Sequence, residues 1–218
     1  MLIIYGSDLS SPSNKVRFVA NAIGIKYDYK IVKLREGEHR SEWFLKLNPA
    51  GKIPVIDDGG FVLFESNAIC KYLAEKHSSP LYPRDLKQRA LVDQWMDFCS
   101  SHVGGALYLI IMNRIFAPIR KIPVNEPAIQ EGFSQLDRYF PVVEQQLSKN
   151  NFLAGDAPTL ADMNLLSQLD PVELAQIDIS GYPNLVHWRK DLRQKDFYTK
   201  CFKEYGESLK AAAVAAKG

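Results

Sequence analysis

Two short polar segments carry side chains that could bind or activate a small charged ligand. The segment 10–13 reads Ser-Ser-Pro-Ser and precedes an apolar helical repeat, and Glu65 and Ser66 precede another. The free N–H groups and the dipole of a helix N-terminus attract a carboxylate, while a glutamate can meet an ammonium group. Glu65 and Ser66 therefore predict a site for a ligand that bears both charges. Ser66 can cap its helix at the same time, and the serines of 10–13 also fit turn and cap roles.

Composition narrows the classes of partner and of chemistry. The chain has 218 residues, and its 27 Lys and Arg nearly balance its 25 Asp and Glu. No run of like charge stands out, so we expect no nucleic-acid partner and no membrane partner. Cys70, Cys99 and Cys201 form no Cys-x-x-Cys pair for zinc or redox chemistry, and we predict buried, reduced thiols and no metal. No motif indicates a serine hydrolase.

We also expect the chain to lack the hydrophobic segments that direct proteins to membranes. Its apolar start at 2–5 ends at Gly6, far short of the apolar region of a secretory signal. We expect no later segment to approach the length of a membrane span. The predicted location is the cytoplasm, where thiols stay reduced.

The elements that must position the polar segments follow from hydrophobic periodicity. Alternating apolar runs indicate strands, and apolar residues at steps of three and four indicate helices. Two apolar runs around the turn Asp57-Asp58-Gly59-Gly60 indicate a hairpin. The resulting order is βαβαββα, with elements around residues 2–5, 16–23, 27–31, 43–47, 54–56, 61–64 and 66–73.

A change of pattern divides the chain into two predicted domains. The stretch Ser-Ser-Pro-Leu-Tyr-Pro at 78–83 breaks the preceding helix, and no convincing strand pattern follows it. We therefore predict an α/β domain at 1–78, a linker at 79–85 and an all-helical domain at 86–218.

The helical domain carries three clear local signals. Residues 129–147 form an apolar stripe, which Pro141 is expected to kink. Thr159 and Asp162 fit a capping box at the start of a buried helix, with Asp in place of the usual Glu. Another helix is predicted to begin at Pro183.

Two strings identify a family that this chain resembles. Asn-Pro-Ala-Gly-Lys-Ile-Pro-Val-Ile at 48–56 is followed, at the expected distance, by Phe-Glu-Ser-Asn-Ala-Ile at 64–69. With the element order, they resemble the cytosolic glutathione transferases from about residue 2 to residue 205, most closely the serine-type theta and delta classes and their bacterial relatives. The resemblance implies a thioredoxin-like first domain, glutathione as co-substrate and a homodimer.

The resemblance also implies how glutathione would be held. It makes the Ile53–Pro54 bond cis, so that the backbone of Ile53 pairs with the cysteinyl part of glutathione. Glu65 and Ser66 match the residues that bind the γ-glutamyl end. His39 and Lys52 match positions that bind the glycyl carboxylate. Without the resemblance, a lone His or Lys would be interpreted as a solvated surface residue.

The segment 10–13 resembles the family's Ser-x-Pro-Cys segment. Counting back from Gly24, which ends the helix, puts the catalytic position at Ser10, with Ser11 as the alternative. A serine hydroxyl is too weak a base to deprotonate glutathione, but it can donate a hydrogen bond to the thiolate, worth roughly 1.5–3 kcal/mol. Ser13 replaces the family's cysteine, which argues against cysteine-dependent chemistry.

The predicted reaction is attack of glutathione thiolate on a hydrophobic electrophile or on a peroxide oxygen. By resemblance, the electrophile pocket is lined by Leu9, Tyr108, Met112 and Phe116, although each could equally be an ordinary core residue. Two alternatives remain: a glutathione-dependent disulfide reductase, and a non-catalytic binding module of the same fold, because fold does not determine function.

Overall fold

The computed structural model describes residues 1–202, 205 and 206 and divides into two compact units. Unit 1 comprises Met1–Tyr82 and the described residues from Gln194 on, and unit 2 comprises Pro83–Arg193. The segment after Arg193 was predicted to belong to the second domain, whereas it packs with the first. The segment is held there by aromatic packing, because the ring centroids of Phe197 and Tyr198 lie 6.1 and 5.0 Å from that of Phe18.

Unit 1 is built on a four-stranded mixed sheet. Its strands are β1 (Leu2–Gly6), β2 (Tyr27–Ile31), β3 (Val55–Asp58) and β4 (Phe61–Phe64), in the order β2-β1-β3-β4. β1 pairs in parallel with β2 and antiparallel with β3, and β3 pairs antiparallel with β4. The central strand is apolar, and Ile4 is fully buried opposite Ile56.

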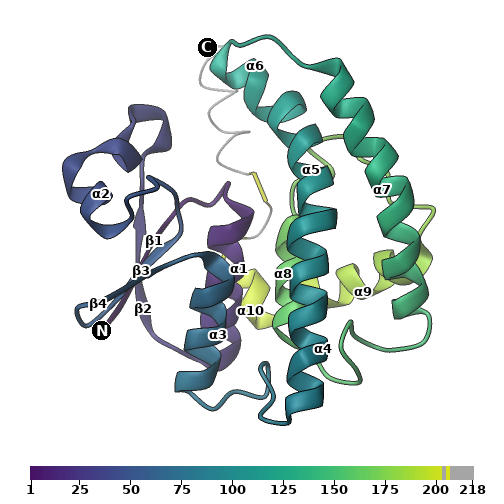
Figure 1. The fold of residues 1–218 in the computed structure, drawn as a ribbon, viewed down its shortest axis with the longest axis horizontal. Helices are drawn as coiled ribbons and strands as arrows, with labels where there is room; N and C mark the ends of the chain where they lie inside the picture. Colours follow the sequence, from purple (N-terminus) through teal and green to yellow (C-terminus); the bar gives the residue numbers. More distant parts are fainter. Residues whose placement is uncertain (203–204, 207–218) are drawn as a thin grey trace. The chain divides into compact units, whose positions relative to one another are not determined.

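Helices cover both faces of this sheet (Figure 1). The helices of unit 1 are α1 (Ser11–Ile23), the 3₁₀ turns η1 (Leu34–Glu36) and η2 (Glu38–Arg40), α2 (Glu42–Leu47), α3 (Ser66–Lys76) and α10 (Asp196–Thr199), which packs on α1. α1 and α3 lie on one face, and α2 lies on the other, where Phe44 packs with Val32 and Val55. Up to α3, the order is the βαβαββα order predicted for a thioredoxin-like domain.

The start of α1 lies very close to the end of β1. A Cβ atom added to Gly6 would lie 2.9 Å from the Cβ of Ser13 and 3.0 Å from the ring of Tyr29. Only glycine avoids these contacts, so Gly6 allows the first turn of α1 to approach the sheet. Ser13 is therefore fully buried, while the preceding loop stays at the surface of unit 1.

Unit 2, all of whose residues are described, is helical, as predicted. Its helices are α4 (Leu86–Asp97), η3 (Phe98–Val103), α5 (Gly104–Ile111), η4 (Met112–Phe116), α6 (Ala117–Arg120), α7 (Glu126–Leu147), α8 (Leu160–Gln168) and α9 (Pro183–Arg193). The segments η3 and η4 are π-helical. α7 continues through Pro141, and α9 begins at Pro183 as predicted.

The helices from α4 to α6 form one continuous rod, Leu86–Arg120. It spans 35 residues and, by length and composition only, is apolar enough to cross a membrane. The sequence-based expectation that no segment approaches a membrane span was therefore wrong. The middle of the rod nevertheless behaves as a core helix, because Ala106, Leu107 and Ile110 are fully buried and α5 packs against α7.

Candidate functional site

The N-terminus of α1 is capped by Ser10. The residue has extended backbone angles, and its Oγ accepts a hydrogen bond from the backbone N–H of Ser13 at 3.3 Å. Because the hydroxyl is the acceptor in this bond, its hydrogen remains available for donation elsewhere. Ser11 is the first helical residue, one position further along the chain. The cap role that we considered for Ser13 thus belongs to Ser10.

The N-terminus of α3 is built differently. Its N-cap residue is Glu65, with φ of 69° and ψ of 105°, and none of the described side chains caps the helix. A positive φ is unusual for a residue other than glycine, and such conformations occur preferentially at functional sites. Ser66 is the first helical residue, so the prediction that Ser66 caps this helix was wrong by one position. The first-turn amides are left without a capping side chain.

The loop before β3 is held by a residue to which sequence analysis gave no role. Asn48 is only 2% exposed; its Nδ2 donates to the carbonyl of Lys52 at 2.7 Å, and its Oδ1 accepts from Ala50 N–H at 3.0 Å. The following Ile53–Pro54 peptide bond is cis, as predicted. Asn48 therefore sets the path of the chain into Ile53.

This loop lies against the short helix that carries His39. A Cβ atom added to Gly51 would lie 3.0 Å from the carbonyl oxygen of His39, and Gly51 has a positive φ of 61°. Glycine thus permits the close approach of the two segments. The Nδ1 atom of His39 is buried and has no hydrogen-bond partner among the described residues. Lys52, in contrast, is exposed.

A buried cation joins α1 to α3. Lys15 is only 2% exposed, and its Nζ donates a hydrogen bond to Oδ1 of Asn67, the second residue of α3. Burial raises the pKa of the nearby Cys70 thiol to about 12, although Lys15 opposes this rise. Sequence analysis missed Lys15. The signal was a lysine four residues before Val19, on the apolar face of α1.

Both halves of the chain match family models. Residues 2–75 match the model "Glutathione S-transferase, N-terminal domain", and residues 105–196 match "Glutathione S-transferase, C-terminal domain". An epsilon-class glutathione S-transferase from the housefly, Musca domestica, is 32% identical, covers 99% of this chain and 98% of its own, and has a TM-score of 0.81.

The chain belongs to the glutathione S-transferase family. Glutathione transferase F7 from Populus trichocarpa is similar as well, with 27% identity, coverage of 92% and 97% of the two chains, and a TM-score of 0.86. A glutathione S-transferase-I solved with bound lactoylglutathione has 28% identity, the same coverage and a TM-score of 0.84. These matches support glutathione transferase activity, as the resemblance predicted.

The residues expected to line the electrophile pocket of this glutathione transferase lie in both units. Leu9 is half-buried in unit 1, in the loop before α1. Tyr108, Met112 and Phe116 follow one another at four-residue steps along the rod of unit 2. Tyr108 is 61% exposed, while Met112 and Phe116 are half-buried. Tyr108 is thus not an ordinary core residue, which was the alternative for this position.

Proposed function

We propose that this glutathione transferase activates glutathione with the Ser10 hydroxyl and conjugates it to hydrophobic electrophiles. The observation that carries the proposal is the state of the Ser10 hydroxyl. It caps α1 as an acceptor and keeps its hydrogen for a ligand. It also stands at the positive end of a helix that has 13 residues.

The chemistry requires a thiolate. A free thiol of this type has a pKa of about 8.5, so only a small fraction of glutathione is ionised at neutral pH. A hydrogen bond from Ser10 and the dipole of α1 both favour the anion, while the proton leaves to solvent. The thiolate then attacks an electrophilic carbon and forms a carbon–sulfur bond, while the bond to a leaving group breaks or, in an addition, an electron pair moves onto the electrophile. With a peroxide, the same thiolate would attack oxygen and break the O–O bond, which gives an alcohol and glutathione sulfenic acid. A second glutathione would then reduce the sulfenic acid, forming glutathione disulfide and water.

The γ-glutamyl end is assigned to Glu65 and Ser66. The uncapped first turn of α3 offers N–H groups to the ligand carboxylate, and Ser66 adds a hydroxyl there. The Glu65 carboxylate complements the ligand ammonium. The unusual backbone angles of Glu65 support a binding role, because a purely structural cap would not need them.

The remaining contacts follow the length of the ligand. Ile53, with Pro54 behind it, presents its backbone to the cysteinyl part of glutathione, and His39 and Lys52 bind the glycyl carboxylate. The unpartnered buried nitrogen of His39 supports this assignment, because buried polar atoms normally have partners. Leu9, Tyr108, Met112 and Phe116 would contact the electrophile. We also propose that the protein is cytoplasmic and that it forms a homodimer. Sedimentation would then give twice the mass of the chain.

One pair of measurements tests the function. Calorimetry should detect glutathione binding, and an assay with a general aromatic electrophile should detect conjugation. Binding without conjugation, together with reduction of glutathione mixed disulfides, would instead establish the disulfide reductase. No binding at all would leave the non-catalytic module.

A further inference from the structure

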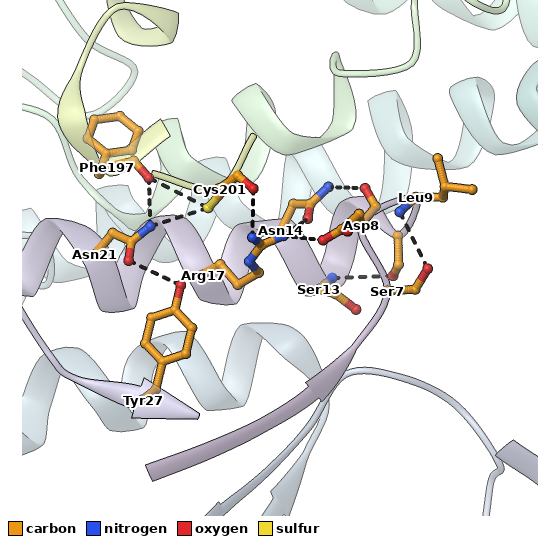
Figure 2. A network of polar contacts seen from close by, with 11 residues as sticks. Ser7, Asp8, Leu9, Ser13, Asn14, Arg17, Asn21, Tyr27, Phe197 and Cys201 are labelled. Carbon is orange, nitrogen blue, oxygen red and sulfur yellow. Dashed lines mark hydrogen bonds and ion pairs between the residues drawn. The ribbon is translucent and has the colours of Figure 1, made fainter. Parts of the chain in front are cut away.

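The described C-terminal segment is tied to α1 and to the loop that leads into it (Figure 2). All of these residues belong to unit 1. Asn21, near the end of α1, donates to the carbonyl of Phe197 at 2.9 Å. Arg17, one turn earlier, donates through Nη2 to the carbonyl of Cys201 at 2.8 Å. Two successive turns of α1 therefore fix the path of the C-terminal segment.

Arg17 also connects this segment to the loop before α1. Its Nη1 donates to Oδ1 of Asp8 at 2.6 Å and to Oδ1 of Asn14 at 3.3 Å, and Asn14 in turn donates to the carbonyl of Asp8 at 2.8 Å. Arg17 is only 6% exposed, and its guanidinium carbon lies 4.2 Å from the ring centroid of Tyr29. Figure 2 shows these bonds converging on Arg17.

The last contact reaches the residue that precedes Ser10. The hydroxyl of Tyr205 donates a hydrogen bond to the carbonyl of Leu9 at 2.9 Å. Tyr205 is only 6% exposed, and its ring lies 5.9 Å from that of Phe202, which packs in turn on Phe18 of α1 at 6.2 Å. The aromatic packing fixes the ring, so the hydroxyl is held in place at the Leu9 peptide.

We propose that Tyr205 is a positioning residue for the reaction, holding the Leu9–Ser10 peptide so that the Ser10 hydroxyl points at the thiolate. The inference rests on the proposed role of Ser10. The Leu9 carbonyl belongs to the same planar peptide unit as the nitrogen of Ser10. A hydrogen bond to that carbonyl therefore limits rotation of the plane from which the Ser10 side chain projects.

The charges near the loop make its geometry important. Asp8 lies two residues before Ser10, and a free carboxylate near the sulfur would disfavour a thiolate. Arg17 pairs with this carboxylate and draws it toward α1. If the loop rotates, the Ser10 hydroxyl no longer points at the sulfur and its hydrogen bond to the thiolate is lost. This loss raises the pKa of the thiol of bound glutathione.

The test compares Tyr205→Phe with Tyr27→Phe. Tyr27 donates to Oδ1 of Asn21 at 3.1 Å and its hydroxyl also interacts with Arg17, so the control removes a hydroxyl from the same network without touching the Leu9 peptide. For Tyr205→Phe we expect turnover to fall about threefold to tenfold at neutral pH, which is the effect of losing one hydrogen bond. At high pH, where the thiol ionises without help, turnover should recover. The KM for glutathione should stay within about twofold. Tyr27→Phe should retain the parent pH profile.

A second readout needs no catalysis. Amide hydrogen exchange of the ligand-free protein should be faster at residues 8–13 in Tyr205→Phe than in the parent, and unchanged there in Tyr27→Phe. An unchanged pH profile or unchanged exchange in Tyr205→Phe overturns the positioning role. If the parent itself neither binds nor conjugates glutathione, the proposed function fails, and the exchange result alone then decides whether Tyr205 holds the loop.

Discussion

The first turns of α3 and α8 solve the same problem in opposite ways. Every helix begins with backbone N–H groups that lack helical partners. At α8, Asp162 is completely buried; its Oδ2 accepts from N–H and Oγ1 of Thr159 at 2.8 and 3.0 Å, and its Oδ1 accepts from Leu153 N–H and Trp188 Nε1 at 3.0 and 3.1 Å. At α3, no side chain in the described part of the chain caps the helix.

The difference separates a structural helix start from one that can bind a ligand. Burial raises the pKa of Asp162, but four hydrogen-bond donors oppose that rise. Both carboxylate oxygens are therefore occupied by hydrogen bonds within the protein. The carboxylate has no capacity for a substrate, and Thr159 and Asp162 form the predicted capping box. At α3, no described side chain takes up the first-turn amides, so they and the Ser66 hydroxyl could serve the proposed ligand carboxylate. At α1, the Ser10 hydroxyl hydrogen could serve the proposed thiolate.

The largest effect is expected at α8, whose first turn is capped by Asp162. Asp162→Ala leaves buried donors at Leu153, Thr159 and Trp188 without an acceptor, so the free energy of unfolding should fall by about 3 kcal/mol or more. Urea denaturation measures this loss. Turnover per folded molecule should not change, because Asp162 is structural.

A matched variant sharpens that result. Asp162→Asn keeps one acceptor oxygen but turns an amide group toward the other pair of donors, so its loss should be intermediate. If Asp162→Ala unfolds like the parent yet loses turnover, the contrast between the two helix starts is mistaken.

The next effect is expected at Ser10. Ser10→Ala should lower turnover about tenfold or more with little change in glutathione affinity, because the hydrogen bond is made to the reacting sulfur. The thiolate absorbance of the bound complex should titrate at higher pH. Ser11→Ala is the control and should resemble the parent. A reversal of these two results would assign the hydroxyl to Ser11, and no effect from either would refute the serine-type mechanism.

A smaller effect is expected at the first turn of α3, which none of the described side chains caps. Ser66→Ala should weaken glutathione binding about fivefold to tenfold by calorimetry, because a hydrogen bond to a charged carboxylate is lost. Since Ser66 follows the N-cap residue, the unfolding free energy should hardly change. Unchanged affinity would show that the γ-glutamyl end binds elsewhere.

The smallest effect is expected at Ser13. Its buried Oγ has no hydrogen-bond partner among the described residues. Ser13→Ala should therefore change the unfolding free energy by about 0.5 kcal/mol or less, or stabilise the protein slightly. A loss above about 2 kcal/mol in urea denaturation would mean that the hydroxyl does have a buried partner. The polar groups in the first turn of α1 would then be more fully hydrogen-bonded within the protein than the contacts of Ser10 indicate.

Much of the fold could be predicted because its signals are local. The alternation at 27–31, the turn at 57–60 and the helical spacing from Val16 depend on neighbours a few residues apart, and each predicted the correct element. The capping box of α8 is equally local, since Thr159 and Asp162 are three residues apart. The cis bond at Ile53–Pro54 followed from a recognised string.

The candidate site was less accessible from the sequence, because its support comes from distant parts of the chain. Tyr205 and Leu9 are 196 positions apart, and Lys15 and Asn67 are 52 apart, so no periodicity or spacing predicts either contact. Even the N-cap of α3 lies one residue before the predicted position, because Glu65 adopts a positive φ that its residue type does not predict. Local patterns predicted the elements of the first unit and their order, and the strings at 48–56 and 64–69 indicated the family. The place of the C-terminal segment in the first unit could not be predicted, because aromatic packing on Phe18 depends on which surfaces meet and not on which residues are neighbours.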